Sequence, residues 1–246
     1  MPGLDWLIAR PVAHRGLHDA AKGIIENTPS AFAAAVACLY GIECDLQLSA
    51  DGEAMVYHDD TLGRLTDGEG RLDAMTTPAL KRLAFKASAD RMITLGELCD
   101  FVAGRVALLI EMKRRPEGDG RLVARTAKVL SGYRGPAAVM SFDADAVAAL
   151  RASAPRLPRG LAAPSRLLRP RRSPGAVKDA LAELGHALHA HPQFIAYSVT
   201  DLPAALPMMA RKLLGLPLLA WTVRSAQERE TSERYADQMI FEGFRP

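Results

Sequence analysis

The stretch VALLIEMK, residues 106–113, carries the pattern that decides the fold: five apolar residues are followed by a glutamate and a lysine. Apolar runs that end in charged residues are typical of buried strands that deliver polar side chains to one rim of a barrel. Three shorter runs earlier in the chain end in the same way, at His14-Arg15, Glu43-Cys44-Asp45 and His58-Asp59. We therefore expect these clusters to meet at one edge of the fold.

Apolar segments alternate with amphipathic ones along the whole chain. The expected strands lie at 11–14, 41–46, 106–112, 136–141, 157–162, 194–199, 217–222 and 238–242. Eight strands that alternate with helices predict an α/β fold, the closed (β/α)8 barrel of the TIM type. Because the chain stops at Pro246, just after the eighth strand, we expect the closing helix to be truncated. The whole of 1–246 is expected to form a single domain.

Helix starts are well marked in the sequence. Thr28-Pro29 offers an N-cap and a proline for the first turn, and the segments 94–97 and 225–228 have capping-box patterns. Further helices are expected at 120–132, 143–152, 175–190 and 203–214. A short helix within residues 3–9 is expected to plug the barrel floor.

The second strand is expected to continue into a β-hairpin. Residues 42–48 and 54–58 flank Asp51-Gly52, and Asp-Gly between two such runs is a strong hairpin signal. Pairing about this turn would bring Asp45 roughly opposite His58 and return the histidine to the barrel mouth. Residues 59–93 are then expected to form a small insertion beside the mouth.

The composition limits the partners and the compartment. The 246 residues are 49% hydrophobic and 24% charged, as in an ordinary globular protein, and a net charge of +3 does not indicate a nucleic-acid partner. No apolar run approaches the roughly 20 residues of a membrane span, so stable membrane insertion is not expected. The start lacks the basic region of a secretory signal, and three cysteines without metal-ligand spacing favour free thiols in the cytoplasm. The oligomeric state stays open.

Two other features have simple interpretations. Residues 151–178 contain eight cations and no acid, which is typical of a solvated basic loop, although contact with an anionic substrate or lipid headgroups is the alternative. His186, His189 and His191 follow one another closely near the end of an expected helix. Since no acidic or cysteine partner has suitable spacing, a surface helix end is favoured over a zinc site.

The acidic clusters favour a metal site. Residues i and i+2 of a strand share a face, so Glu43 and Asp45 are expected to point together while Cys44 points away. With Glu111 they provide three carboxylates from two strands, an oxygen-rich set suited to Mg²⁺ or Ca²⁺. A carboxylate pair that faces solvent or an arginine is the alternative, but three acids and two histidines at strand ends make it less favoured.

The histidines and cations suit chemistry on an anion. His14 and His58 are the natural acid-base pair because imidazole titrates near working pH. Arg15 and Lys113 can hold a phosphate, the arginine through its planar fork and the lysine as a point charge. A structural histidine or a capping arginine is the alternative for each position taken alone.

An ordered series of motifs covers residues 12–113 and resembles the glycerophosphodiester phosphodiesterase family of phospholipase-C-like phosphodiesterases. The matching segments are Ala13-His14-Arg15-Gly16, Glu26-Asn27-Thr28, Glu43-Cys44-Asp45, Asp51-Gly52, His58-Asp59-Asp60-Thr61-Leu62 with Arg64, Thr66 and Gly70, the segment 93–98, Ile110-Glu111-Met112-Lys113 and, more loosely, Trp221-Thr222-Val223. A lone His-Arg-Gly would be a weak signal, whereas the ordered series is a strong one.

The resemblance implies a function and a set of roles. It implies metal-dependent hydrolysis of a glycerophosphodiester to glycerol 3-phosphate and an alcohol. Residues matching Glu43, Asp45 and Glu111 would hold the metal, those matching His14 and His58 would be the catalytic pair, and those matching Arg15 and Lys113 would contact phosphate.

Two departures from the family pattern lie near the expected mouth. Arg224 follows Trp-Thr-Val where the family often has asparagine, and Phe241-Glu242-Gly243 replaces a frequent Thr-Asp. We expect them to affect the alcohol group of the substrate rather than the core chemistry. Trp221 ends the seventh expected strand and is expected to pack on the glycerol carbons, with a core position between barrel and helices as the alternative.

Two other functions remain open at this point. The same groups could cleave a lysophospholipid or another phosphodiester, which an apolar channel beside the mouth would favour. A barrel that binds phosphorylated ligands without catalysis is the third interpretation. It would be favoured by the loss of a catalytic or metal residue, but all of them are present.

Overall fold

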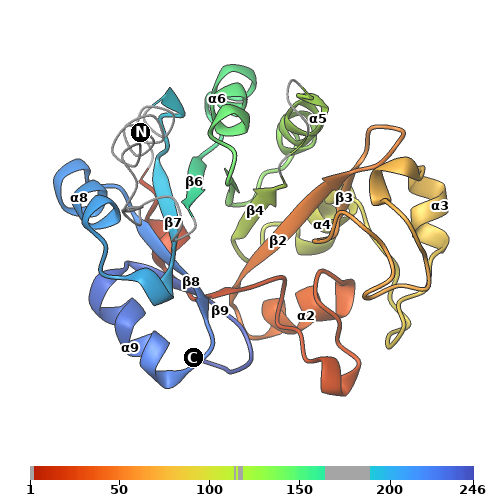
Figure 1. Ribbon diagram of the computed structural model, residues 1–246, viewed down its shortest axis with the longest axis horizontal. Helices are drawn as coiled ribbons and strands as arrows, with labels where there is room; N and C mark the ends of the chain where they lie inside the picture. The colour runs from red at the N-terminus through yellow and green to blue at the C-terminus, as the bar shows by residue number, and fades with distance from the viewer. Residues whose placement is uncertain (1–2, 114, 116–118, 164–188) are drawn as a thin grey trace, which may run out of the picture.

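Eight parallel strands close into a barrel that is surrounded by helices (Figure 1). The computed structural model describes residues 3–113, 115, 119–163 and 189–246. The barrel strands are β1 (Val12–Ala13), β2 (Gly41–Leu48), β4 (Leu108–Met112), β5 (Ala137–Ser141), β6 (Arg159–Ala163), β7 (Phe194–Ser198), β8 (Leu218–Val223) and β9 (Gln238–Phe241). Pairing of β1 with both β2 and β9 closes the sheet and confirms the predicted TIM-type barrel.

The predicted hairpin follows β2. Strand β3 (Ala54–Val56) pairs antiparallel with the end of β2, with Leu46 opposite Val56. The Tyr57 amide donates to the Asp45 carbonyl at 3.0 Å, so Tyr57 lies opposite Asp45 and His58 follows one residue later. The pairing predicted from the turn is therefore correct to within one residue.

Helices cover the outside of the barrel in Figure 1. The α-helices are α1 (Asp5–Ile8), α2 (Pro29–Ala37), α3 (Thr77–Arg82), α4 (Leu95–Val102), α5 (Arg121–Leu130), α6 (Ala144–Ser153), α8 (Ala205–Leu214) and α9 (Ala226–Tyr235). Short 3₁₀ turns are η1 (Ala20–Lys22), η2 (Leu72–Ala74) and η4 (Val199–Asp201). The expected helix at 175–190 lies largely outside the described residues, and residues 242–246 after β9 contain no helix.

The helix caps follow the sequence signals in part: in the predicted 225–228 capping box, the Glu228 carboxylate accepts from the Arg224 amide instead of the Ser225 amide. Thr94 and Glu97 form the reciprocal capping box of α4, and Ser225 accepts from the Glu228 amide at the start of α9. Thr28 stands at the N-cap position of α2, but its hydroxyl donates to the Ile25 carbonyl at 2.7 Å instead of accepting from the helix. Pro29 still fixes the first turn.

Alternation along the strands separates two apolar cores. Outward residues pack under the helices, whereas inward residues such as Leu109, Ala138 and Leu219 fill the barrel. Leu7 of α1 is buried against these inward residues, and the Ile8 carbonyl accepts from Gln238 Nε2 at 2.8 Å. Helix α1 therefore plugs the barrel floor as expected.

The segment after β3 has a small apolar core of its own, formed by residues including Tyr57, Leu72, Leu80 and Phe85. The division into one domain with an insertion at 59–93 stays a prediction. None of the helices within residues 3–113, 115, 119–163 and 189–246 is long and apolar enough to cross a membrane.

The basic segment 151–178 is only partly described. Arg151 is exposed but belongs to α6, and Arg156 is exposed between α6 and β6. Arg159 is buried at the start of β6, where Nη1 donates to Gln193 Oε1 at 3.3 Å, so the expectation of one solvated loop is wrong for these positions. The remaining cations, Arg166, Arg169, Arg171, Arg172 and Lys178, lie outside the described residues.

The histidine string is also only partly described. His186 lies outside the described residues, while His189 and His191 are exposed at the end of a helix. Their position agrees with the expected surface helix end.

Candidate active site

Polar side chains gather at the carboxyl ends of the barrel strands. This is the end at which TIM barrels carry their sites, because loops of different lengths follow the strands there. Ile42, Cys44 and Leu46 of β2 pack outward under the helices, so Glu43 and Asp45 face the barrel interior. The sequence expectation that these two acids share a face while Cys44 points away is confirmed.

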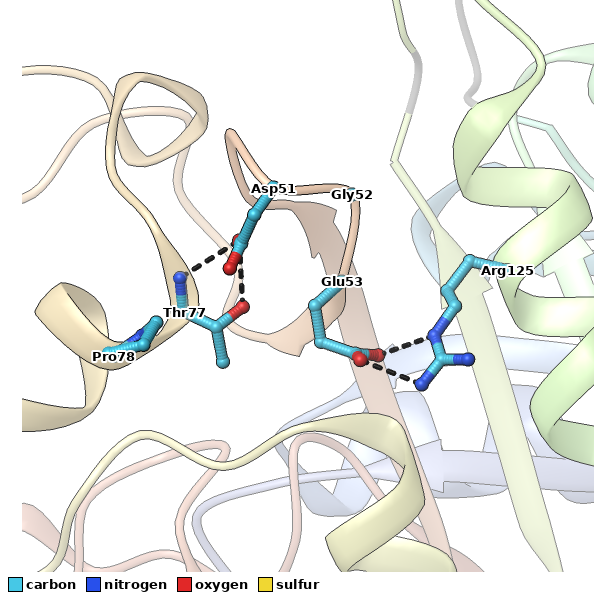
Figure 2. Close-up of a pocket in the computed structure, with 6 residues that line it drawn as sticks. All are labelled: Asp51, Gly52, Glu53, Thr77, Pro78 and Arg125. Atoms are coloured by element: carbon cyan, nitrogen blue, oxygen red, sulfur yellow. Dashed lines mark hydrogen bonds and ion pairs between the residues drawn. The ribbon is translucent and has the colours of Figure 1, made fainter.

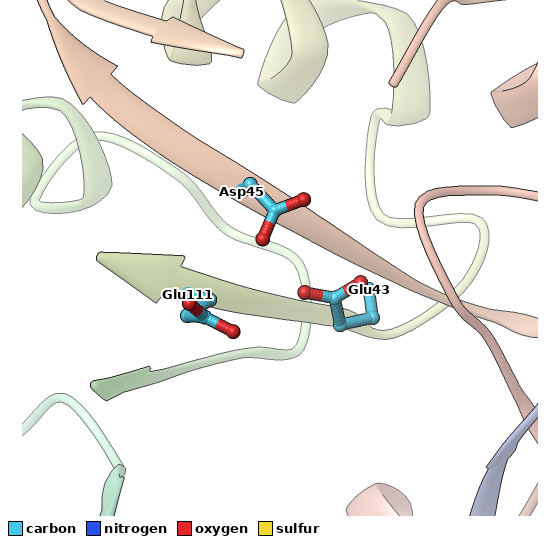
Figure 3. A group of neighbouring side chains, drawn as sticks. All are labelled: Glu43, Asp45 and Glu111. Atoms are coloured by element: carbon cyan, nitrogen blue, oxygen red, sulfur yellow. The ribbon is translucent and has the colours of Figure 1, made fainter. Parts of the chain in front are cut away.

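Three buried carboxylates form the centre of the site. Glu43 and Asp45 come from β2 and Glu111 from the neighbouring β4, with Asp45 directly opposite Glu111 in the strand register. Figure 3 shows the three carboxylates turned toward one another, and ligand oxygens from all three lie within 4.8 Å of one another. Glu43 Oε1 is buried without a hydrogen-bond partner. Such oxygen donors fit a hard divalent cation.

Burial and mutual repulsion perturb these acids. Burial raises the pKa of Glu43 well above its ordinary value, and the charges of Asp45 and Glu111 raise it further. Burial together with Asp45 likewise raises the pKa of Glu111 to about 7. Burial opposes ionisation of Asp45 as well, but Lys113 and Arg15 lower its pKa to about 2. A further positive charge beside Glu43 and Glu111 would favour their ionised forms.

The two predicted phosphate contacts border the carboxylates. Lys113 Nζ lies 2.7 Å from Asp45 Oδ1 and 2.5 Å from Glu111 Oε1. Arg15 Nε lies 3.2 Å from Asp45 Oδ2, and its backbone amide donates to Glu43 Oε2 at 2.9 Å. Both side chains are about one-sixth exposed, which leaves part of each cation open to the mouth.

The loop after β1 has the tight conformation that the His-Arg-Gly motif permits. Arg15 and Gly16 both have positive φ angles, of 57° and 81°. A Cβ at Gly16 would lie 2.9 Å from the backbone carbon and the Cβ of Ala31, so only glycine fits there. This turn directs the Arg15 amide and side chain toward the acids of β2.

His14 is held by the carboxylate of Glu242, directly after the last strand. Its Nδ1 lies 2.5 Å from Glu242 Oε2, while its Nε2 lies 3.9 Å from Glu43 Oε2. Burial lowers the pKa of His14 below 6.5, and the hydrogen bond to Glu242 opposes that shift. Burial would raise the pKa of Glu242, but the hydrogen bond from His14 and the nearby His18 ring, whose Nε2 lies 3.6 Å from Glu242 Oε2, lower it well below its ordinary value.

Glu242, one of the two departures from the family pattern, has a partner that the sequence did not reveal. Its side chain contacts His14 directly, and its second oxygen accepts from Arg224 Nε at 2.5 Å. Both departures from the family pattern therefore lie in one ion-paired group beside His14. An acid directly after the last strand was the signal that could have revealed this contact.

His58 also has a carboxylate partner. Its Nδ1 lies 2.7 Å from Asp59 Oδ1, and its backbone carbonyl accepts from Gln47 Nε2 at 3.0 Å. The side chain is about one-third exposed, so the ring borders the open mouth. The structure thus gives each histidine an acidic partner at Nδ1.

The Glu26-Asn27 pair supports the site from the β1–α2 connection. Asn27 Nδ2 donates to Asp45 Oδ2 at 2.8 Å, and Glu26 Oε1 accepts from Arg15 Nη1 at 2.7 Å. Asn27 has a positive φ of 57°, a conformation that asparagine tolerates better than most residues. The Glu-Asn-Thr motif is visible in the sequence, but its contacts with Asp45 and Arg15 depend on the folded loop.

Trp221 faces the barrel interior near the mouth. It follows Leu219 by two residues on β8 and packs against the inward core, with its ring edge-to-face on Phe142 at 5.3 Å. Its indole Nε1 is buried without a hydrogen-bond partner. Trp221 therefore packs with the inward-facing residues and not in the outer layer between the barrel and the helices.

A hollow at the hairpin tip lies apart from these residues. Figure 2 shows it bordered by Asp51, which accepts from the Thr77 amide and hydroxyl, and by Glu53, which forms a two-pronged ion pair with Arg125. Both acids are fully engaged in anchoring the hairpin to α3 and α5. The hollow includes none of the predicted site residues.

Comparison with known proteins agrees with the motif series. A family model described as the glycerophosphoryl diester phosphodiesterase family matches residues 14–243. The chain belongs to this family. A glycerophosphodiester phosphodiesterase from Caldanaerobacter subterraneus is 36% identical over 110 residues, which cover 42% of this chain and 44% of that protein. "Probable glycerophosphodiester phosphodiesterase 1" from Mycobacterium tuberculosis is 33% identical over 172 residues, which cover 60% and 61%. The chain thus spans about half the length of these family members.

A solved phosphodiesterase structure has the same fold. An Oleispira antarctica phosphodiesterase, solved in complex with the product sn-glycerol-3-phosphate, superposes with a TM-score of 0.77 at 21% identity. The superposition covers 94% of this chain and 91% of that one. At 21% identity, this similarity supports the barrel fold and nothing beyond it.

Proposed function

We propose that the protein hydrolyses glycerophosphodiesters to glycerol 3-phosphate and an alcohol with the help of a divalent cation. The observation that carries the proposal is the buried group of Glu43, Asp45 and Glu111 at the barrel mouth, which also carries two carboxylate-paired histidines. Membership of the family agrees with this reading. So does the relative from Oleispira antarctica, which binds the product sn-glycerol-3-phosphate.

The three acids are the proposed metal ligands. They supply oxygen donors from two adjacent strands, and Glu43 Oε1 has no hydrogen-bond partner among the residues that the structure describes. Such a set suits Mg²⁺ or Ca²⁺, which both prefer oxygen ligands. A bound cation would supply charge neutralisation at the phosphate and the glycerol hydroxyls.

The two histidines are the proposed acid-base pair. In each ring Nδ1 faces a carboxylate, Glu242 for His14 and Asp59 for His58, so Nε2 is the nitrogen left for proton transfer. One histidine takes the proton from the attacking hydroxyl, and the other donates a proton to the leaving alkoxide. The same pair serves whether the attacking hydroxyl belongs to water or to the substrate itself.

Arg15 and Lys113 are the proposed phosphate contacts. Each is partly exposed and lies against the acids, so both cations would be available to a phosphate if these acids held a divalent cation. Fixed positive groups there stabilise the negative charge that builds up on the phosphate oxygens. Trp221 is proposed to pack on the glycerol carbons, because its ring faces the barrel interior near the mouth.

One observation favours a second substrate class. Phe142 lies edge-to-face on Trp221 and is 37% exposed, so an apolar surface continues from Trp221 to the outside. A lysophospholipid could place an apolar portion there.

We also propose a reducing compartment such as the cytoplasm, because all three cysteines are free thiols.

A substrate panel tests the proposal. Purified protein would be given glycerophosphocholine, glycerophosphoethanolamine, glycerophosphoglycerol and a lysophospholipid, with enzymatic detection of glycerol 3-phosphate and of the free alcohol. The proposal expects glycerol 3-phosphate from at least one glycerophosphodiester. Release of a lysophosphatidate would support the second class, and binding of these compounds without any turnover would support a non-catalytic barrel.

A further inference from the structure

Arg64, in the segment between β3 and η2, makes contacts that no catalytic role yet explains. Its Nε donates to Asp59 Oδ2 at 2.6 Å and its Nη2 to Asp59 Oδ1 at 3.1 Å. The other edge of the guanidinium faces Glu26, with Nη2 2.7 Å from Oε1 and Nη1 3.2 Å from Oε2. The Arg64 side chain thus contacts both oxygens of Asp59 and both oxygens of Glu26, although it is nearly half exposed.

Each of these carboxylates holds one member of the candidate active site. Asp59 Oδ1 lies 2.7 Å from His58 Nδ1, and Glu26 Oε1 accepts from Arg15 Nη1 at 2.7 Å. The contacts therefore form a continuous chain from His58 to Arg15, with Arg64 at its middle. Glu26 follows β1 and Asp59 follows β3, so Arg64 also joins two separate loops of the mouth.

The geometry requires arginine rather than any cation. A guanidinium presents its donors in a fixed planar fork and can serve two carboxylates along two edges, whereas a lysine ammonium is a single point charge. An exposed ion pair contributes little to stability by itself. The value of these contacts therefore lies in the orientation of the groups that Asp59 and Glu26 hold.

We propose that Arg64 is a positioning residue that fixes Asp59 and Glu26 together, and through them sets the imidazole of His58 and the guanidinium of Arg15. Asp59 accepts from Nδ1–H and so selects the tautomer whose Nε2 is free toward the mouth. Glu26 holds the Arg15 guanidinium in place beside Asp45. The kinetic part of this inference rests on the proposed phosphodiesterase function, whereas the tautomer of His58 does not.

The test compares Arg64→Ala and Arg64→Lys with a matched control. Arg71→Ala is that control, because Arg71 lies in the same segment and makes a similar two-pronged pair, with Asp73, away from both histidines. Nitrogen-15 NMR of the His58 ring, assigned with His58→Gln, reports the tautomer at about pH 8, where an ordinary imidazole is neutral. Initial rates over a range of substrate concentrations report kcat and KM separately.

We expect both Arg64 variants to shift His58 from one tautomer to a mixture. We expect kcat to fall on the order of 10-fold to 100-fold, the scale of a small misplacement of reacting groups. KM should rise as well because Arg15 loses its support. Millimolar guanidinium, far below denaturing concentrations, should restore part of kcat in Arg64→Ala but not in His58→Gln. Arg71→Ala should resemble the wild type in all measurements.

An unchanged His58 tautomer in folded Arg64→Ala would overturn the inference. So would a lower melting temperature with wild-type kcat in the folded fraction, since that would give Arg64 a purely structural role. If the wild type hydrolysed no member of the substrate panel, the proposed function would fail. The NMR comparison would still decide the role of Arg64.

Discussion

His14 and Glu242 are joined across the barrel closure, with Nδ1 of the histidine 2.5 Å from Oε2 of the glutamate. His14 follows β1 and Glu242 follows β9, and these two strands are neighbours because the sheet closes on itself. The contact therefore joins residues 228 positions apart in the chain. It leaves Nε2 of His14 on the side of the buried acids.

Glu242→Gln tests the value of this contact. The amide keeps the size of the side chain but removes the charge that holds the His14 ring. We expect kcat to fall on the order of 10-fold or more, but by less than in His14→Ala, since the imidazole is still present. Glu233→Gln on α9, where the acid pairs with Arg229 at the surface, is the matched control. Equal rates in both glutamine variants would show that Glu242 does not support His14.

Removal of either histidine should impair the reaction itself. His14→Ala and His58→Ala are each expected to lower kcat on the order of 10²-fold or more, the usual contribution of an acid-base group. The fold should survive, because both rings lie at the mouth rather than in an apolar core. Steady-state kinetics and circular dichroism of the same preparations check both points. Wild-type turnover in one variant would remove that histidine from the mechanism.

Metal binding should stabilise the protein more at alkaline than at acidic pH. The pKa of Glu111 is raised from 4.5 to about 7, so without metal its ionisation costs stability as pH rises between those values. The pKa of Glu43 is also raised, so its ionisation likewise costs stability as pH rises. The pKa of Asp45 is lowered from 3.8 to about 2, and its contribution changes only below that window. A bound cation would remove the cost by pairing with the ionised acids.

Thermal unfolding with Mg²⁺ or with EDTA measures this difference. At a metal concentration 100 times Kd, binding adds about 2.7 kcal/mol. For a chain of this size that corresponds to a rise of roughly 5–10 °C in Tm. We expect a rise on this scale near pH 8 and a much smaller one near pH 5, where the acids take up protons. A Tm difference that does not change with pH would argue against Glu43 and Glu111 as ligands.

Trp221→Ala separates a substrate contact from a core contact. The indole faces the mouth end of the barrel interior and packs on the partly exposed Phe142. We therefore expect a lower kcat/KM with a stability loss below the roughly 3–5 kcal/mol of a fully buried aromatic. Trp221→Phe is the control that keeps a ring and loses the unpartnered N–H. A large fall in Tm with unchanged kinetics would reverse the assignment.

The barrel and its acidic centre were predictable because they depend on local periodicity. Two-residue alternation in β2 sets Glu43 and Asp45 on one face, and the apolar run before Glu111 marks a neighbouring buried strand. The Asp-Gly turn gave the hairpin to within one residue. These features follow from chain geometry over a few positions.

The contacts that orient the histidines were not predictable in the same way. The pairing of His14 with Glu242 depends on closure of the barrel, and the contact of Arg64 with Glu26 depends on the path of two loops. Side chains that meet through such long-range closure leave no periodic signal in one sequence. Thr28 shows the same limit at short range, since its hydroxyl bonds to Ile25 rather than capping α2.

Turnover before and after metal removal tests the central claim most directly. The claim is that Glu43, Asp45 and Glu111 hold a divalent cation that hydrolysis requires. Protein dialysed against EDTA should release no glycerol 3-phosphate from a substrate of the wild type, and Mg²⁺ or Ca²⁺ should restore the rate. Glu43→Gln should stay inactive after the same additions. Full turnover by exhaustively demetallated protein would contradict the account.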